Sequence, residues 1–118
     1  MPASAPSSSA QHQLVLCTCP DQITAQTIAN ALVDQQLAAC VNILPGLTSV
    51  YQWQGQRETA QEHLLMAKTT NEAYEALEQA ITTLHPYELP EVIAVPILQG
   101  LNAYLRWIEQ QTTTKPHE

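Results

Sequence analysis

The residues in this sequence best suited to chemistry are two cysteines, a histidine and a glutamate. Cys17 and Cys19 are one residue apart in a β-type run, so both thiols point to one face of a strand, about 6.5 Å apart along it. His85 and Glu91 frame a proline-rich turn after an expected helix. Thiolate plus imidazole suits Cu(I), Cu(II) or Zn(II), and a carboxylate widens the choice toward harder cations. A metal site is therefore one hypothesis for this chain.

The same residues also have other interpretations, which the sequence leaves open. The cysteines can pack as small buried hydrophobes, His85 can cap the C-terminus of its helix, and Glu91 can simply begin a strand. Alternatively, His85, Tyr87 and Lys68 can line a cleft for a small anion or an amphipathic ligand. Lys68 can instead pair with Glu91, which would compete with the metal hypothesis. His63 lies in an alternating strand and can face either way.

Composition excludes several classes of protein. The chain has 118 residues, four Lys or Arg residues and a formal net charge of -7, so it lacks the basic surface that nucleic acids and anionic membranes require. No apolar run is long enough to span a bilayer. Three cysteines without a signal peptide predict reduced thiols and a cytoplasmic protein. No phosphate loop, HExxH or GxSxG motif occurs, which favours a non-enzymatic protein over one that uses His85 and Glu91 as an acid/base pair.

The elements that must position these residues follow from the apolar periodicity. Strands are expected at 13–19, at 39–53 with a turn or bulge at Pro45-Gly46, at 62–70 after a polar loop, and at 92–98. Helices are expected from an Asp21 cap to Gln36, from an Asn71 cap to Leu84, and from Gly100 to Gln111. This β-α-β-β-α-β order with a C-terminal helix predicts an α+β, ferredoxin-like fold, an antiparallel sheet with helices on one face.

Two further expectations concern the limits of the domain and its long hairpin. Residues 1–12 are expected to be a disordered N-terminal tail, 13–111 the folded domain and 112–118 a C-terminal tail, so His12 and His117 would bind metal only adventitiously. The hairpin extends beyond what one small core can cover. Tyr51 and Trp53 lie on one face of it, which predicts a subunit interface.

A series of short motifs then points to a family. In order, the chain carries Leu37-Ala-Ala-Cys-Val-Asn42, Pro45-Gly46, Ser49-Val-Tyr-Gln-Trp-Gln-Gly55, Lys68-Thr69, His85-Pro-Tyr87, Pro90-Glu91 and Tyr104-Leu-Arg-Trp107. Together these motifs resemble the CutA family, the divalent-cation tolerance proteins, over roughly residues 14–108. The chain departs from the family at Gln56, where a lysine is common, and at Ala60-Gln61, where acids are frequent. These departures concern the hairpin tip.

The resemblance implies a ferredoxin-like fold and a tight homotrimer, similar to PII-type signalling proteins, in which the long hairpins pair across subunits. It also implies a cytosolic protein that binds copper, with zinc as the second choice, and takes part in the response to metal ions. The proposed family ligands correspond to Cys17, His85 and Glu91, whereas Cys19 occupies a variable position and is not counted among them. The alternative is a PII-like sensor of small molecules, with clefts between subunits that Lys68 and Tyr87 would line.

Overall fold

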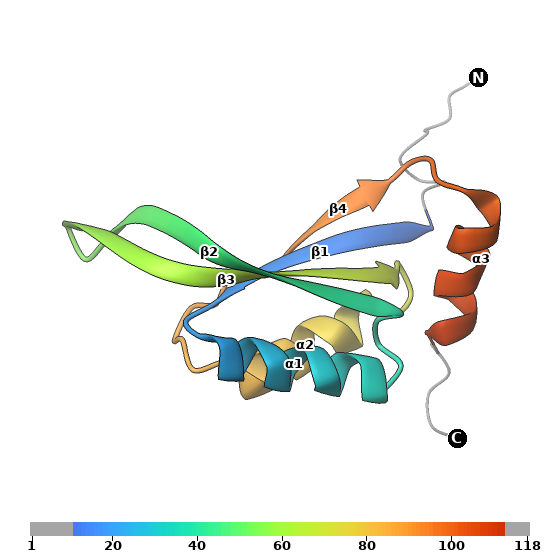
Figure 1. Ribbon diagram of the computed structural model, residues 1–118, viewed down its shortest axis with the longest axis horizontal. Helices are drawn as coiled ribbons and strands as arrows, with labels where there is room; N and C mark the ends of the chain where they lie inside the picture. Colours follow the sequence, from blue (N-terminus) through green and yellow to red (C-terminus); the bar gives the residue numbers. More distant parts are fainter. Residues whose placement is uncertain (1–10, 113–118) are drawn as a thin grey trace.

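Four strands form one antiparallel sheet, and two helices cover one of its faces (Figure 1). The structure is a computed structural model that describes residues 11–112; the predicted tails lie largely outside this range. The strands are β1 (His12–Cys19), β2 (Cys40–Trp53), β3 (Gln56–Thr70) and β4 (Ile93–Ile97), and the helices are α1 (Gln22–Asp34), α2 (Tyr74–Leu84) and α3 (Asn102–Gln111). The sheet order is β2-β3-β1-β4. The predicted α+β, ferredoxin-like arrangement is thereby confirmed.

The core lies between the sheet and the helices α1 and α2. Alternate residues of β1 and β3 point into it, and the apolar face of each helix meets them. The largest contributors from the helices are fully buried: Ile28 and Leu32 from α1, Leu77 and Ile81 from α2. Cys17 and Cys19 belong to this core, so whatever chemistry they carry takes place beneath the helices. Within residues 11–112, no helix has both the length and the apolar character needed to cross a membrane.

The β2–β3 hairpin is longer than the sequence predicted. The irregularity expected at Pro45-Gly46 is present as a register shift between Leu44 and Leu47, with Gly46 at φ 80°. The polar loop expected before Glu62 was wrong, because β3 already begins at Gln56 after a two-residue turn. Gln54 and Gly55 in this turn both have positive φ, which matches the strand twist. The hairpin projects past the helices at one end of the molecule (Figure 1).

Three element ends differ from the prediction or refine it. β1 begins at His12, which pairs with Thr70 and Ile97 and is therefore part of the sheet rather than of a tail. The cap of α2 is Ala73 and not Asn71; the hydroxyl of Thr70 accepts the Ala73 N–H at 3.3 Å. β4 is an edge strand, as Pro96 predicted. Proline has no N–H to donate, and a strand with a neighbour on one side only can hold it without losing a ladder hydrogen bond.

Candidate metal centre

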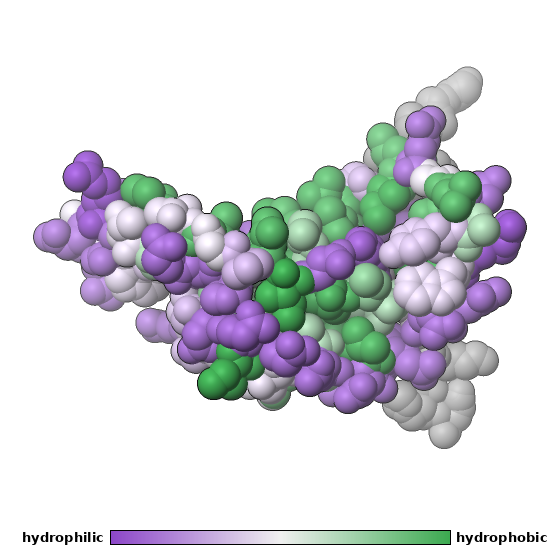
Figure 2. Space-filling model, viewed as in Figure 1, coloured by the Kyte–Doolittle hydropathy of each residue, from purple (hydrophilic) through white to green (hydrophobic). Residues whose placement is uncertain are grey.

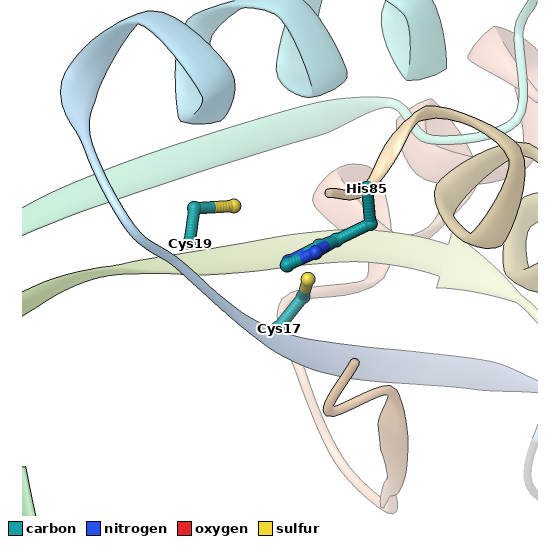
Figure 3. Close-up of side chains that lie close together, drawn as sticks. All are labelled: Cys17, Cys19 and His85. Atoms are coloured by element: carbon teal, nitrogen blue, oxygen red, sulfur yellow. The ribbon is translucent and has the colours of Figure 1, made fainter. Parts of the chain in front are cut away.

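Two thiols and one imidazole converge beneath the helices (Figure 3). One ligand atom from each of Cys17, Cys19 and His85 lies within 4.8 Å of the other two. The cysteines are fully buried and His85 is 8% exposed. Among residues 11–112 this is the only group of three potential metal ligands that approach so closely. The donor set is the soft-to-borderline combination that copper and zinc prefer.

Local sequence explains why these side chains meet. β1 alternates, so Cys17 and Cys19 share the face that points toward the helices. Pro86 cannot continue α2, and His85 leaves the helix as its C-cap in an extended conformation, while its backbone N–H still donates to Ile81 O at 2.8 Å. The change of backbone direction at His85 turns the imidazole toward Cys17 and Cys19 on β1, as Figure 3 shows.

Both ring nitrogens of His85 are engaged by backbone groups. Nε2 lies 2.8 Å from Thr18 O, and Nδ1 accepts the N–H of Tyr87 at 3.1 Å. A carbonyl can only accept and an amide can only donate, so the proton is on Nε2 and the ring is neutral. A metal bound to His85 would therefore replace one of these two bonds. The imidazole fastens the turn to the end of β1 as well as facing the thiols.

The two thiols influence each other's ionisation. A hydrogen bond with Cys19 and burial raise the pKa of Cys17, and the charges of Glu91 and Glu62 raise it further. The same contact lowers the pKa of Cys19, while the Cys17 thiol donates to Thr18 O at 3.8 Å. One proton thus leaves this pair more easily than the second. A cation that binds between the sulfurs would supply the charge needed to release both.

The other residues singled out from the sequence lie elsewhere. Glu91 is outside the cluster and lines a groove near it. Lys68 donates to Asn42 Oδ1 at 2.5 Å and lies 4.0 Å from Cys40 Sγ, so its recorded partners do not include Glu91. Tyr51 and Trp53 are 45% and 39% exposed on the projecting hairpin.

The groove near Glu91 has a volume of about 810 Å³ and runs between the hairpin and the turn after α2. Its charged side chains are all acidic and its rings are tyrosine and tryptophan: Glu62, Glu88, Glu91, Tyr51, Trp53 and Tyr87. The Tyr87 hydroxyl donates to Glu62 Oε2 at 2.6 Å. Burial and this carboxylate raise the pKa of Tyr87. Tyr87 thus lines this groove of the single chain, and Lys68 is not among the residues that line it.

Sequence reasoning gave too little weight to two residues. Cys19 carried a signal, since its spacing from Cys17 places both sulfurs on one face, but the family comparison set it aside as a variable position. Glu62 carried none. It is 6% exposed at a point of β3 where the chain leaves the core for the projecting hairpin, and only the fold brings Tyr87 to it.

The comparisons with known proteins agree on one family. The family model described as "CutA1 divalent ion tolerance protein" matches residues 13–111. The "Divalent-cation tolerance protein CutA" of Thermus thermophilus is 50% identical over 100 residues, which are 85% of this chain and 97% of the relative. The human "Protein CutA" is 46% identical over 95 residues; the match covers 80% of this chain but only 53% of the human protein.

Solved structures give the same result. The "Divalent cation tolerance protein (Cut A1)" from Thermus thermophilus superposes with a TM-score of 0.85 at 49% identity and covers 86% of this chain and 99% of that one. CutA1 from Oryza sativa superposes with a TM-score of 0.87 at 38% identity and covers 90% and 97%. Both the sheet and the helices that enclose the cysteines are therefore shared with these proteins.

Proposed function

The chain belongs to the CutA1 family of divalent ion tolerance proteins, and from this premise we propose that it binds a divalent metal ion between Cys17, Cys19 and His85. In this proposal it is a binding protein rather than an enzyme, and it acts in metal tolerance. The observation that carries the proposal is the convergence of three buried ligand atoms within 4.8 Å. Copper and zinc are both suited to this donor set, and copper is the ion that the family resemblance suggests first.

The residues present suit a divalent ion in charge as well as in donor type. Two thiolates and a neutral imidazole would carry a charge of about -2, which a divalent cation cancels inside the core. Ligand atoms that share one ion lie roughly 4 Å apart, so the cluster needs only a small contraction. The cost is one of the two hydrogen bonds of His85, from Thr18 O or from the Tyr87 amide.

Calorimetric titration of zinc and copper under anaerobic conditions tests this assignment. We expect one ion per chain in the wild type, and a loss of affinity of at least about tenfold in Cys19→Ser. Glu91→Gln is the matched comparison, because Glu91 belongs to the ligand set suggested by the family but lies outside the cluster. Unchanged binding in Cys19→Ser together with loss in Glu91→Gln would overturn the site in favour of Cys17, His85 and Glu91.

We further propose that the protein is a homotrimer in the cytoplasm. The face of the sheet opposite the helices carries apolar side chains, and Figure 2 shows them gathered in the hollow between the hairpin and α3. Leu44, Ile93 and Val95 on this face are 45–52% exposed, and Val50, Tyr51 and Trp53 are exposed on the hairpin. An apolar surface of this extent is typical of subunit contacts. Three free thiols suit a reducing compartment, and cell fractionation would check the location.

The acidic groove supports a second candidate function, a sensor of small molecules. The sequence suggested a small anion, but the carboxylates of Glu62, Glu88 and Glu91 would repel one. Carboxylates together with three aromatic rings favour an organic cation instead. Thermal-shift screening of amines and carboxylic acids in the presence of a chelator tests this candidate. A shift caused by amines, lost in Glu62→Gln and kept in Lys68→Gln, would support it; shifts by acids alone would contradict it.

A further inference from the structure

His63 lies directly across the sheet from the thiol cluster. In the register between β1 and β3, Cys19 is opposite His63 and Cys17 is opposite Leu65. Residues opposite one another in an antiparallel pair project from the same face. Leu65 is part of the core, so His63, two residues away along the strand, also faces the helices. This settles a question that the alternation of the strand had left open.

The imidazole of His63 has an unused nitrogen. Nδ1 of His63 is buried without a hydrogen-bond partner, and among the described side chains only Gln13 Oε1 shares this condition. Nearly all buried polar atoms in folded proteins are paired, so an orphaned ring nitrogen needs an explanation. His63 is one of the groups that lower the pKa of Asp21, although hydrogen bonds from Thr24 are the main cause. Asp21 itself is exposed, and its carboxylate is already engaged as the cap of α1.

We propose that His63 is the fourth ligand of the ion and completes a Cys2His2 set with Cys17, Cys19 and His85. This inference rests on the proposed metal site and makes its chemistry specific. Opposed residues in a sheet have Cβ atoms about 5 Å apart, within which an imidazole can reach a metal beside the facing sulfur. His63 lies outside the group whose ligand atoms approach within 4.8 Å, so binding includes a rotation of its ring toward Cys19.

The fourth ligand determines which ion the site prefers. Two sulfur and two nitrogen donors in a closed, buried position are the ligand set of structural zinc, which is tetrahedral. The two thiol protons pass to solvent as the ion enters, and the two thiolates then balance the charge of Zn²⁺ with both imidazoles neutral. The proposed site therefore has the ligand set and the geometry of a structural zinc site. Cys19 and His63 can bind the same ion because they are opposite one another in the sheet.

Spectroscopy of the full-length protein loaded with Co²⁺, together with competition measurements of Zn²⁺ affinity, tests the role of His63. We expect the intense visible absorption of tetrahedral Co²⁺ in the wild type. In His63→Gln this absorption should change, and Zn²⁺ affinity should fall by at least about tenfold. The matched control is His12→Gln, which alters a buried histidine at the opposite end of β1 and should leave both readouts unchanged.

A measurement on the wild type keeps the proposal testable if His63→Gln does not fold. In ¹⁵N NMR, a ring nitrogen of His63 should shift on addition of Zn²⁺. Zinc that binds with unchanged ring signals from His63, or with unchanged affinity and Co²⁺ absorption in His63→Gln, would overturn the fourth ligand and leave the three-residue site standing. A wild type that binds neither zinc nor copper would instead refute the proposed function itself.

Discussion

The His85 side chain holds two backbone segments together and also lies beside the two thiols. Its ring bridges the carbonyl of Thr18, at the end of β1, and the amide of Tyr87, in the turn after α2. It also packs against the ring of Tyr87, with centroids 4.7 Å apart. The expected capping of α2 by a charged histidine is replaced by a neutral ring that joins two segments. Loss of metal binding in a His85 variant would therefore have to be separated from loss of the turn.

The contribution of the His85 hydrogen bonds to stability can be measured in the metal-free protein. In His85→Ala, a buried carbonyl and an amide lose their partner, and the free energy of unfolding should fall by about 2 kcal/mol or more. Urea denaturation in the presence of a chelator measures this. His63→Gln serves as the comparison, because Nδ1 of His63 has no partner to lose, and it should cost clearly less. Equal losses in the two variants would show that the His85 bonds contribute little.

At the scale of residues, the sequence predicted where some candidate ligands lie but not which of them come together. The strand periodicity placed Cys17 and Cys19 on one face, and the prolines placed His85 at a helix end, because both signals are local. Glu91 could not be placed, since its distance from the thiols depends on how the turn after α2 folds. The face of His63 could not be chosen either, because it depends on the register of β3 against β1.

Helix α1 begins with a side-chain cap and ends with a backbone hydrogen-bond motif. It begins at Asp21, whose carboxylate accepts the N–H of Thr24 at 2.8 Å. It ends with Gln36 at φ 60°, where the amide of Leu37 donates to Leu32 O at 2.9 Å and that of Gln36 to Val33 O at 3.0 Å. This is a Schellman motif with glutamine in the position that usually holds glycine. The helix covers the cysteines, so its ends influence the site.

Replacing the glutamine should stabilise the protein. Gln36→Gly removes the strain of a side chain in the left-handed region and should raise the free energy of unfolding by roughly 0.5–1 kcal/mol. The control is Gln35→Gly, because Gln35 has φ -88° and gains nothing from glycine; that variant should be destabilised. Chemical denaturation checks both. A destabilised Gln36→Gly would contradict this account of the helix end.

The start of α1 should make stability depend on pH in the acid range. The hydrogen bonds from Thr24 lower the pKa of Asp21 below its ordinary value of 3.8. A carboxyl with a lowered pKa stabilises the fold above that ordinary value, and its contribution disappears as the pH falls through the lowered pKa. Asp21→Asn keeps a capping oxygen but cannot ionise. We expect the stability difference between wild type and variant to shrink from about pH 6 to about pH 2; a difference independent of pH would contradict this.

At the scale of elements, the sequence predicted every helix and strand but not all of their ends. Apolar periodicity identified the buried parts of each element because burial imposes the pattern. It failed in residues 56–61, where the hairpin leaves the core and both faces meet solvent, so the strand has no apolar alternation to reveal it. The start of α2 was also misjudged: the cap is Ala73, and the Thr70 hydroxyl accepts the Ala73 N–H.

Within residues 11–112, the helices α1 and α2 cover one face of the sheet (Figure 1) and leave apolar side chains exposed on the other. Ile93 is opposite Leu16, and Val95 is opposite Leu14, on the side away from the helices. The β2–β3 hairpin projects from the sheet beyond the helices (Figure 1). The fold follows from the order of the elements, whereas the assembly does not, because exposed apolar residues in a sequence resemble core residues. The trimer therefore stays a prediction from the family resemblance and this surface.

A charge on that face should disrupt the assembly. Ile93→Glu places a carboxylate where Ile93 is 52% exposed in the single chain, and it should reduce the trimer to smaller species. Ile23→Glu is the control, since Ile23 is 79% exposed on α1, away from the sheet face. Light scattering coupled to size-exclusion chromatography gives both masses. A monomeric wild type, or a trimer that tolerates Ile93→Glu, would contradict the assignment.

The central claim is that the ion is held by Cys17, Cys19 and His85, and X-ray absorption spectroscopy of the zinc-loaded protein tests it most directly. The account predicts two sulfur neighbours at about 2.3 Å and nitrogen neighbours at about 2.0 Å. In Cys19→Ser, one sulfur neighbour should disappear while the metal edge remains. A first shell made only of oxygen and nitrogen, or a single sulfur that persists unchanged in Cys19→Ser, would contradict the site.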